Sequence, residues 1–317
     1  MVIAVGFVSR RKGLLDGRTT PVLSRFVTDV TLPALIFLQM VETVDMDSLR
    51  VGWTIPLLAI VGTCLGFAAG WATWRLFATR TQAPVFIFTS GMSNWVYLPL
   101  PIVASLYGKG GLQTLFLCNL GLQTLFWTLG VAILHGGRLD TRAMKNLFSN
   151  PGLIATLAGI CFALFRGITG DSLTSIALHE PVHSAVEIIL DSLRLLGQAT
   201  IPVSLIVTGA QIATATMIEK RPTSAIAGIA LNRLIIAPIL GVAMLWLFNC
   251  FFPVLTVAQL YVLAIVLLMP VSVTSTVITD KMNQDTALAA QAVLYTTLAS
   301  IMAVPPMFML ARAILGG

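Results

Sequence analysis

"GMSNWVYLPLPIV", residues 91–103, lies inside an otherwise apolar stretch but is poorly suited to a continuous helix. It contains Pro99 and Pro101, and a proline removes a backbone donor and clashes with the preceding helical turn. In lipid, backbone groups freed in this way must be satisfied by other parts of the protein or by a water-filled cavity. We therefore interpret this stretch as an interrupted membrane helix.

The composition places the chain in a lipid bilayer. Of its 317 residues, 57% are hydrophobic and only 10% are charged, whereas soluble domains carry about 25% charged residues. The net charge is +6, but the basic residues are scattered through short connections. This pattern favours a membrane-orientation signal and argues against nucleic-acid binding.

Hydropathy predicts an all-α protein with about ten membrane spans, because one crossing needs about 20 apolar residues. The first segment would rise only about 13 Å as a helix, so we expect either a shortened first helix or a start further upstream. The expected segments are 1–9, 20–42, 52–77, 83–107, 112–135, 150–168, 185–212, 223–248, 255–279 and 286–314.

Basic residues in alternate connections predict the orientation. By the positive-inside rule these connections face the cytoplasm and both termini face outward, in a multi-pass protein of the cell (inner or plasma) membrane. The residues are Arg10, Arg11, Lys12, Arg18, Arg75, Arg80, Arg138, Arg142, Lys145, Lys220, Arg221 and Lys281.

The order of the segments predicts an inverted repeat. Five segments lie in 1–135 and five in 150–317, on either side of a basic cytoplasmic linker at 136–149. An odd number of spans per half inverts the second half relative to the first, as in many secondary transporters.

The ninth segment has an irregularity that matches the opening one. "LAIVLLMPVSVTSTVITDK", residues 263–281, contains Pro270 followed by Ser272 and Thr274. Interrupted helices at corresponding positions of two halves indicate a binding site, with helix N-termini offered to an anion or carbonyls to a cation. The alternative is that each proline only kinks a packed helix. The site hypothesis predicts that the two stretches meet in space.

The stretch "SNWVYLPLPIV", residues 93–103, resembles the Asn–x6–Pro signature of the auxin efflux carrier family, within the bile-acid/arsenite/riboflavin transporter superfamily. The resemblance extends over nearly the whole chain. Further similar stretches are "GFVSRRKGLLDGRTTPVLSRFVTDVTLPALIF" (6–37), "IPVSLIVTGAQIA" (201–213), "LNRLIIAPILG" (231–241) and "MPVSVTSTVITDKMNQDTALAAQAVLYTTLASI" (269–301).

The resemblance implies a scaffold bundle and a mobile core in which the fourth and ninth helices are broken and cross. It also implies gradient-driven transport of organic anions by an elevator-like movement, often by a homodimer. The chain departs from the family pattern at three positions, with Pro99 in place of Gly and with Thr274 and Asp29 where Asn is frequent. The substrate therefore stays open among mono- and dicarboxylates and auxin-like acids.

These patterns predict the site residues. Asn94, Ser93, Ser272, Thr274 and Arg233 are expected to bind substrate, while Pro99, Pro101 and Pro270 mark the helix breaks. An Arg some eleven residues into the eighth segment should face the protein interior, where its guanidinium can hold a carboxylate. Alternatively, Arg233 is tied to backbone carbonyls or to Asp29.

Asp29 lies about 13 Å into the second segment by helix rise, where a carboxylate is costly and is a candidate carrier of a coupling proton. The alternative is a structural pair with Arg25, one turn earlier.

Other polar and small residues in the spans have structural interpretations. Gly62, Gly66 and Gly70 predict close helix packing. A further group lines a cavity or joins helices, and we favour the second role. This group is Asn119, Gln123, Gln291 and Tyr295.

The sequence thus predicts a carrier for small organic anions coupled to protons or sodium, without a cofactor or a metal site. An enzyme is disfavoured because the chain has no HExxH, GxSxG or paired catalytic Asp motif. A sodium-coupled bile-acid-type symporter, a channel and a non-transporting sensor are the alternatives.

Overall fold

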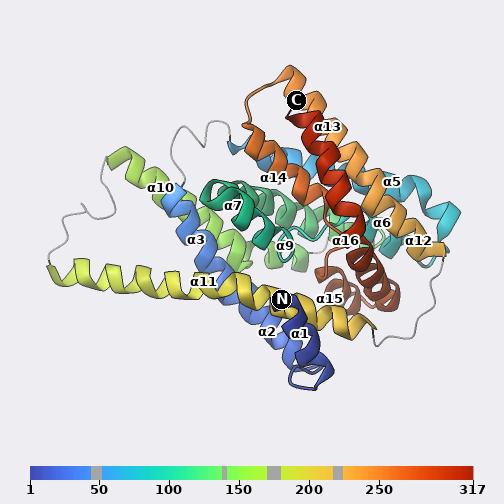
Figure 1. The fold of residues 1–317 in the computed structure, drawn as a ribbon, viewed down its shortest axis with the longest axis horizontal. Helices are drawn as coiled ribbons and strands as arrows, with labels where there is room; N and C mark the ends of the chain where they lie inside the picture. The colour runs from blue at the N-terminus through green and yellow to red at the C-terminus, as the bar shows by residue number, and fades with distance from the viewer. Residues whose placement is uncertain (44–51, 138–140, 170–179, 217–223, 317) are drawn as a thin grey trace.

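The computed structural model describes residues 1–43, 52–137, 141–169, 180–216 and 224–316, which form helices and no named strand (Figure 1). Part of the predicted linker, 138–140, lies outside these ranges, as do the basic residues Lys220 and Arg221.

Six described helices are long and apolar enough to cross a membrane, so this is a multi-pass membrane protein. Four predicted segments fold as shorter or interrupted helices, and the total of ten spans stays a prediction. The six are Thr19–Thr43, Thr54–Phe77, Pro99–Leu134, Ile188–Thr214, Ser224–Phe251 and Thr286–Leu315; the shorter apolar helices are Pro151–Phe165 and Val257–Leu268.

One group of helices packs against α11, the longest described helix, or against its neighbour α3; α11 runs across the molecule in Figure 1. Small residues allow α1 to approach it closely, because a Cβ at Gly6 or Gly209 would meet the backbone of the other helix. We call this the α11 group. Its members are α1 (Val2–Arg11), α2 (Thr19–Phe26), η1 (Val27–Thr31), α3 (Leu32–Thr43), α10 (Pro151–Thr169) and α11 (Glu180–Thr216).

The other helices pack around α5 and α7, and we call them the α5 group. The α5 group comprises α5 (Thr54–Phe77), α6 (Ala83–Gly91), α7 (Pro99–Leu125), η2 (Phe126–Gly130), α8 (Val131–Leu134), α9 (Thr141–Phe148), α12 (Ser224–Leu231), η3 (Asn232–Ile236), α13 (Ala237–Phe251), α14 (Val257–Leu268), α15 (Thr274–Lys281) and α16 (Thr286–Leu315). The labels η1, η2 and η3 denote short π-helical segments.

The glycines of α5 permit the tight packing of this group. An ideal Cβ on Gly66 would lie 3.1 Å from the Cα of Gly91 at the end of α6, and one on Gly62 would lie 2.7 Å from Cδ2 of Leu267 in α14. The predicted role of this glycine series in close packing is confirmed, because a larger residue would push α6 and α14 away from α5.

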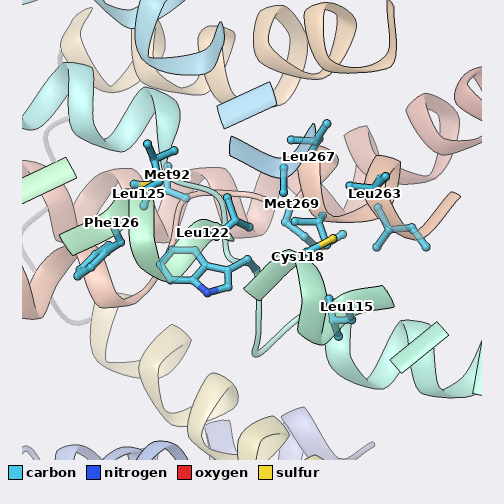
Figure 2. Packing of buried hydrophobic residues seen from close by; sticks show 14 of the residues in the cluster. Met92, Leu115, Cys118, Leu122, Leu125, Phe126, Leu263, Leu267 and Met269 are labelled. Carbon is cyan, nitrogen blue, oxygen red and sulfur yellow. The ribbon is translucent and has the colours of Figure 1, made fainter. Parts of the chain in front are cut away.

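Helix α7 changes direction at Gly108, whose φ of 54° lies in the left-handed region that favours glycine. This residue separates the parts of α7 that correspond to the fourth and fifth predicted segments. Figure 2 shows side chains of the second part, Cys118 and Leu122, gathered in the core beside Met92 and Met269. These methionines directly follow α6 and α14, so the core surrounds the point where both helices end.

Candidate functional site

The two irregular stretches, 92–98 and 269–273, lie side by side. Ser93 and Val271 form an isolated antiparallel bridge. The Asn94 backbone N–H donates to the Pro270 carbonyl at 2.8 Å, and the Ser272 N–H donates to the Met92 carbonyl at 3.0 Å. These bonds confirm that the two stretches meet in space, and each supplies hydrogen bonds that the other lacks within its own helix. We call this region the crossing.

The prolines lie where helices begin or end. Pro99 is the first residue of α7, where the fixed proline φ suits the helix and the missing N–H costs nothing. Met269, which precedes Pro270, has extended geometry with φ −64° and ψ 149°, as expected for the residue before a proline. The chain therefore leaves helical geometry for several residues at both positions.

A cavity of about 170 Å³ lies at the crossing. Both helix groups contribute to its wall, and most of the lining side chains are polar or aromatic. The lining residues are Thr28, Asp29, Leu32, Asn94, Trp95, Val96, Tyr97, Asn119, Gln123, Phe126, Trp127, Asn150, Gly152, Ser272 and Thr274.

Asn94 presents a hydrogen-bond donor at the crossing. Its side chain is 2% exposed, and its Oδ1 accepts the Tyr97 N–H at 3.1 Å just before α7 begins. That bond fixes the amide orientation, and the buried Nδ2 has no partner among the described residues. Asn94 also lines a water-sized cavity of about 10 Å³ with Gln211 and Thr297, whose side-chain oxygens are unpaired as well.

The polar face of α7 and η2 forms the opposite wall. Asn119, Gln123 and Trp127 follow one another at helical spacing and all line the cavity. Asn119 Oδ1 accepts the Trp95 indole N–H at 3.0 Å, so this residue both joins segments and lines the cavity. The buried Trp127 Nε1 has no partner within the described structure and is a second available donor.

The other residues predicted at the two stretches take different positions. Ser272 and Thr274 line the cavity, and Thr274 is also the first residue of α15. Ser93 is buried, but it is not among the lining residues. The crossing therefore brings Asn94, Ser272 and Thr274 together at the cavity, whereas Ser93 is buried and does not line it.

Asp29 lies in η1 and lines the same cavity. Its side chain is 47% exposed, and its Oδ2 lies 3.8 Å from Nε of Arg25, a mostly exposed side chain. This is the alternative pairing that the sequence left open. An exposed pair at that distance contributes little to stability, so the carboxylate remains accessible from the cavity.

Arg233 is buried, 2% exposed, but it lies outside the cavity lining. Its Nη1 donates to the Gly91 carbonyl at 2.8 Å and its Nη2 donates to the Leu267 carbonyl. This placement corresponds to the alternative of a guanidinium tied to backbone carbonyls. We therefore do not retain Arg233 as a direct substrate ligand. Among the residues that the structure describes, the lining contains one carboxylate, Asp29, and no Lys, Arg or His.

The chain matches the profile of a known family along most of its length. The family is described as membrane transport protein, and the matched residues are 1–143 and 138–308. The chain belongs to this family. The family is one of membrane transport proteins, so membership indicates transport as the class of function.

Two curated relatives of this chain are both named uncharacterised transporters. One, from Methanothermobacter thermautotrophicus, is 28% identical over 54% of this chain and 57% of its own length. The other, from Methanocaldococcus jannaschii, is 24% identical over 66% of this chain and 65% of its own length. The chain thus spans somewhat more than half the length of these relatives.

Several residues of the cavity were not predicted from the sequence. Trp127 and Asn150 were not singled out, although Trp127 continues the spacing of Asn119 and Gln123, which was an available signal. The π-helical segments were also missed. Two of them, η1 and η2, contribute lining residues, and the third contains Arg233. Such segments often occur at functional sites.

Proposed function

We propose that the protein is a secondary active carrier for small organic anions, such as mono- or dicarboxylates or auxin-like acids. The observation that carries this proposal is the pair of buried, unpaired donors at the cavity, Asn94 Nδ2 and Trp127 Nε1. A substrate carboxylate is an acceptor with two oxygens, and it can accept a hydrogen bond from either donor.

Helix ends supply the positive potential that such an anion needs. Helices α7 and α15 begin next to the cavity, at Pro99 and Thr274. Pro99 and Pro101 have no N–H, and the N–H groups of Leu100, Ser275 and Thr276 already donate to the carbonyls of Val96, Ser272 and Val273. What these ends contribute is the partial positive charge of a helix N-terminus. A carboxylate can therefore bind without a basic side chain in the lining.

The proposed architecture is a five-plus-five inverted repeat of about ten spans. In this proposal α6 and the first part of α7 form one broken span, and α14 and α15 form the other. The halves are 1–135 and 150–317, joined by the linker 136–149. The two family matches, which overlap at residues 138–143 inside that linker, support the division.

The cavity suggests how access alternates. Asp29 and Asn150 belong to or adjoin elements of the α11 group, whereas Asn94 and Ser272 belong to the crossing. In an elevator-like movement the α5 group slides past the α11 group, so the cavity opens to one side of the membrane at a time. We propose a homodimer in the cell membrane, with the basic connections in the cytoplasm and both termini outside.

Asp29 is the proposed site of ion coupling. As the only carboxylate among the described residues of the lining, it can take up a proton together with the substrate anion. A sodium-coupled symporter of the bile-acid type would use a sodium gradient instead. A channel or a sensor would need no gradient coupling at all.

Two experiments test this function. A thermal-shift screen of mono- and dicarboxylates, with and without sodium and across pH, should identify a stabilising carboxylate. Flux of that compound into proteoliposomes should be saturable and driven by a pH gradient. A sodium requirement would favour the symporter, and non-saturable flux would favour a channel. Stabilisation by no carboxylate at any pH would exclude an organic-anion carrier.

A further inference from the structure

Four helix ends meet at the crossing, and two of them are C-termini. Helix α6 ends at Gly91 and α14 ends at Leu268, each just before an irregular stretch. The last carbonyls of a helix have no intrahelical donor, and they carry partial negative charge. These two negative ends lie beside the two positive ends of α7 and α15, so part of the positive potential at the cavity would be cancelled.

Arg233 binds both of these C-termini. Its Nη1 donates to the carbonyl of Gly91, the last residue of α6, and its Nη2 donates to the carbonyl of Leu267 in the last turn of α14. The planar guanidinium holds two donors in a fixed fork, which suits two acceptors from different helices better than the single ammonium of a lysine.

The guanidinium is a buried cation without an anionic side-chain partner. Within the described part of the chain no carboxylate forms an ion pair with Arg233, and its Nε makes no hydrogen bond. Burying an unpaired charge is costly. The carbonyl ends of α6 and α14 are the groups that offset this cost, so they and the cation are electrostatically coupled.

Local structure fixes the position of Arg233. It lies in η3, and its neighbour Asn232 donates from Nδ2 to Thr73 Oγ1 of α5 at 2.7 Å. Gly66 of α5 approaches both the Gly91 Cα and the Ala237 Cβ closely. The guanidinium is thus held against the crossing by elements that are themselves packed against α5.

We propose that Arg233 is an internal counter-charge for the C-termini of α6 and α14, and that it thereby keeps the cavity side of the crossing electropositive. It acts through the helix ends as a positioning and charge-specificity residue and does not touch the substrate. The benefit of this role to the protein rests on the proposed anion transport. The electrostatic potential at the crossing, however, can be measured without any substrate.

A cysteine at the start of α15 can report that potential. Thr274→Cys places a thiol at the N-terminus of α15, beside the cavity. Only the thiolate reacts with uncharged N-ethylmaleimide, and a positive potential favours the thiolate. The labelling rate at this position, quantified by mass spectrometry from pH 5 to 10, should therefore have its midpoint below about 8.5, the value for an ordinary thiol.

Adding Arg233→Gln to the reporter should raise this midpoint by about one pH unit, the order expected for a nearby charge in a medium of intermediate permittivity. Arg233→Lys keeps the charge and should leave the midpoint within a few tenths of a unit. The matched control is Arg75→Gln, which removes an exposed cation in the last turn of α5 and should produce no shift.

An unchanged midpoint in folded Arg233→Gln protein would overturn the proposal, and so would an absence of labelling at every pH. If Arg233→Gln does not fold, the Arg233→Lys variant tests the proposal in its place. A retained midpoint with a lower melting temperature supports a counter-charge role, while a midpoint raised by about one pH unit, the shift expected for loss of the charge, would overturn it. None of these readings depends on carboxylate binding, so failure here is distinct from failure of the transport proposal.

Discussion

The backbone N–H of Asn94 donates to the carbonyl of Pro270 at 2.8 Å, and this bond joins two stretches that lie far apart in the chain. The Ser272 N–H also donates to the Met92 carbonyl at 3.0 Å. Together the two bonds satisfy main-chain groups that have no hydrogen-bond partner within a helix. The side chains around these bonds are then left to line a cavity. One of them, Asn94, carries an unpaired donor.

Replacing Asn94 by aspartate should separate the role of its Oδ1 as an acceptor for the Tyr97 N–H from the proposed role of its Nδ2 as a donor to substrate. Asn94→Asp retains the oxygen that accepts the Tyr97 N–H, and a negative charge near the N-terminus of α7 is favourable, so we expect the protein to fold. The new carboxylate removes the Nδ2 donor and repels a substrate anion. Isothermal titration should show carboxylate affinity falling at least about tenfold, or about 1.4 kcal/mol.

Asn94→Ala is the control for this change. It removes both the oxygen that accepts the Tyr97 N–H, worth about 1 kcal/mol of stability, and the donor, worth about 1–3 kcal/mol of binding, so melting temperature and affinity should fall together. If Asn94→Asp binds carboxylate as tightly as the wild type, Nδ2 does not contact the substrate and instead faces the small cavity beside Gln211.

Trp127→Phe tests the second donor. The substitution keeps an aromatic ring against Phe126, whose ring centroid lies 5.1 Å away, but it removes the indole N–H. We expect carboxylate affinity to fall by about 1 kcal/mol, with little change in melting temperature. Trp71→Phe, on an indole that is 67% exposed, is the matched control and should leave affinity unchanged. Equal effects of the two substitutions would exclude Trp127 as a substrate donor.

The meeting of the two stretches could be predicted because prolines in apolar segments leave a local signal. Pro99 and Pro270 mark interruptions that a single sequence reveals, and the inverted order of segments suggests that the interruptions face each other. The glycine spacing of α5 was informative for the same reason, since small residues at helical intervals indicate close packing.

The partners of Arg233 could not be predicted in the same way. The depth of Arg233 in an apolar segment indicated burial, which is confirmed, but its acceptors are main-chain carbonyls of Gly91 and Leu267. Every residue has a carbonyl, so no residue type identifies such an acceptor. The exposure of the Asp29 side chain could not be predicted either, because it depends on how the two helix groups pack.

The Asp29→Asn substitution tests whether Asp29 couples transport to proton uptake. The neighbours of Asp29 include Arg25 and Tyr97, and the exposed pair with Arg25 contributes little to stability, so the variant should fold. An amide cannot take up a proton at these pH values, so carboxylate binding should persist while the pH dependence of proteoliposome flux disappears. Arg25→Gln, which leaves the carboxylate in place, should retain that dependence.

A different outcome would assign Asp29 to structure. Unaltered pH-driven flux in well-folded Asp29→Asn protein would remove it from the coupling role. A marked loss of melting temperature in both Asp29→Asn and Arg25→Gln would indicate that the pair stabilises η1.

The glycines of α5 provide a test of how helix packing supports the crossing. A Cβ on Gly66 would lie 3.1 Å from the Gly91 Cα and 3.3 Å from the Ser90 carbonyl oxygen, and neither backbone atom can move without shifting α6. Gly66→Ala should therefore cost about 1–3 kcal/mol through overpacking. It should also lower carboxylate affinity, because Gly91 begins the stretch that positions Asn94.

Gly110→Ala is the matched control, because a Cβ there meets no atom within 4 Å. Alanine is favoured over glycine within a helix by up to about 1 kcal/mol, so this variant should melt at the same or a higher temperature and bind carboxylate normally. The two substitutions add the same methyl group to helices, and their effects should have opposite signs. If Gly66→Ala were as stable as Gly110→Ala, the close approach of α5 and α6 would not hold the crossing in place.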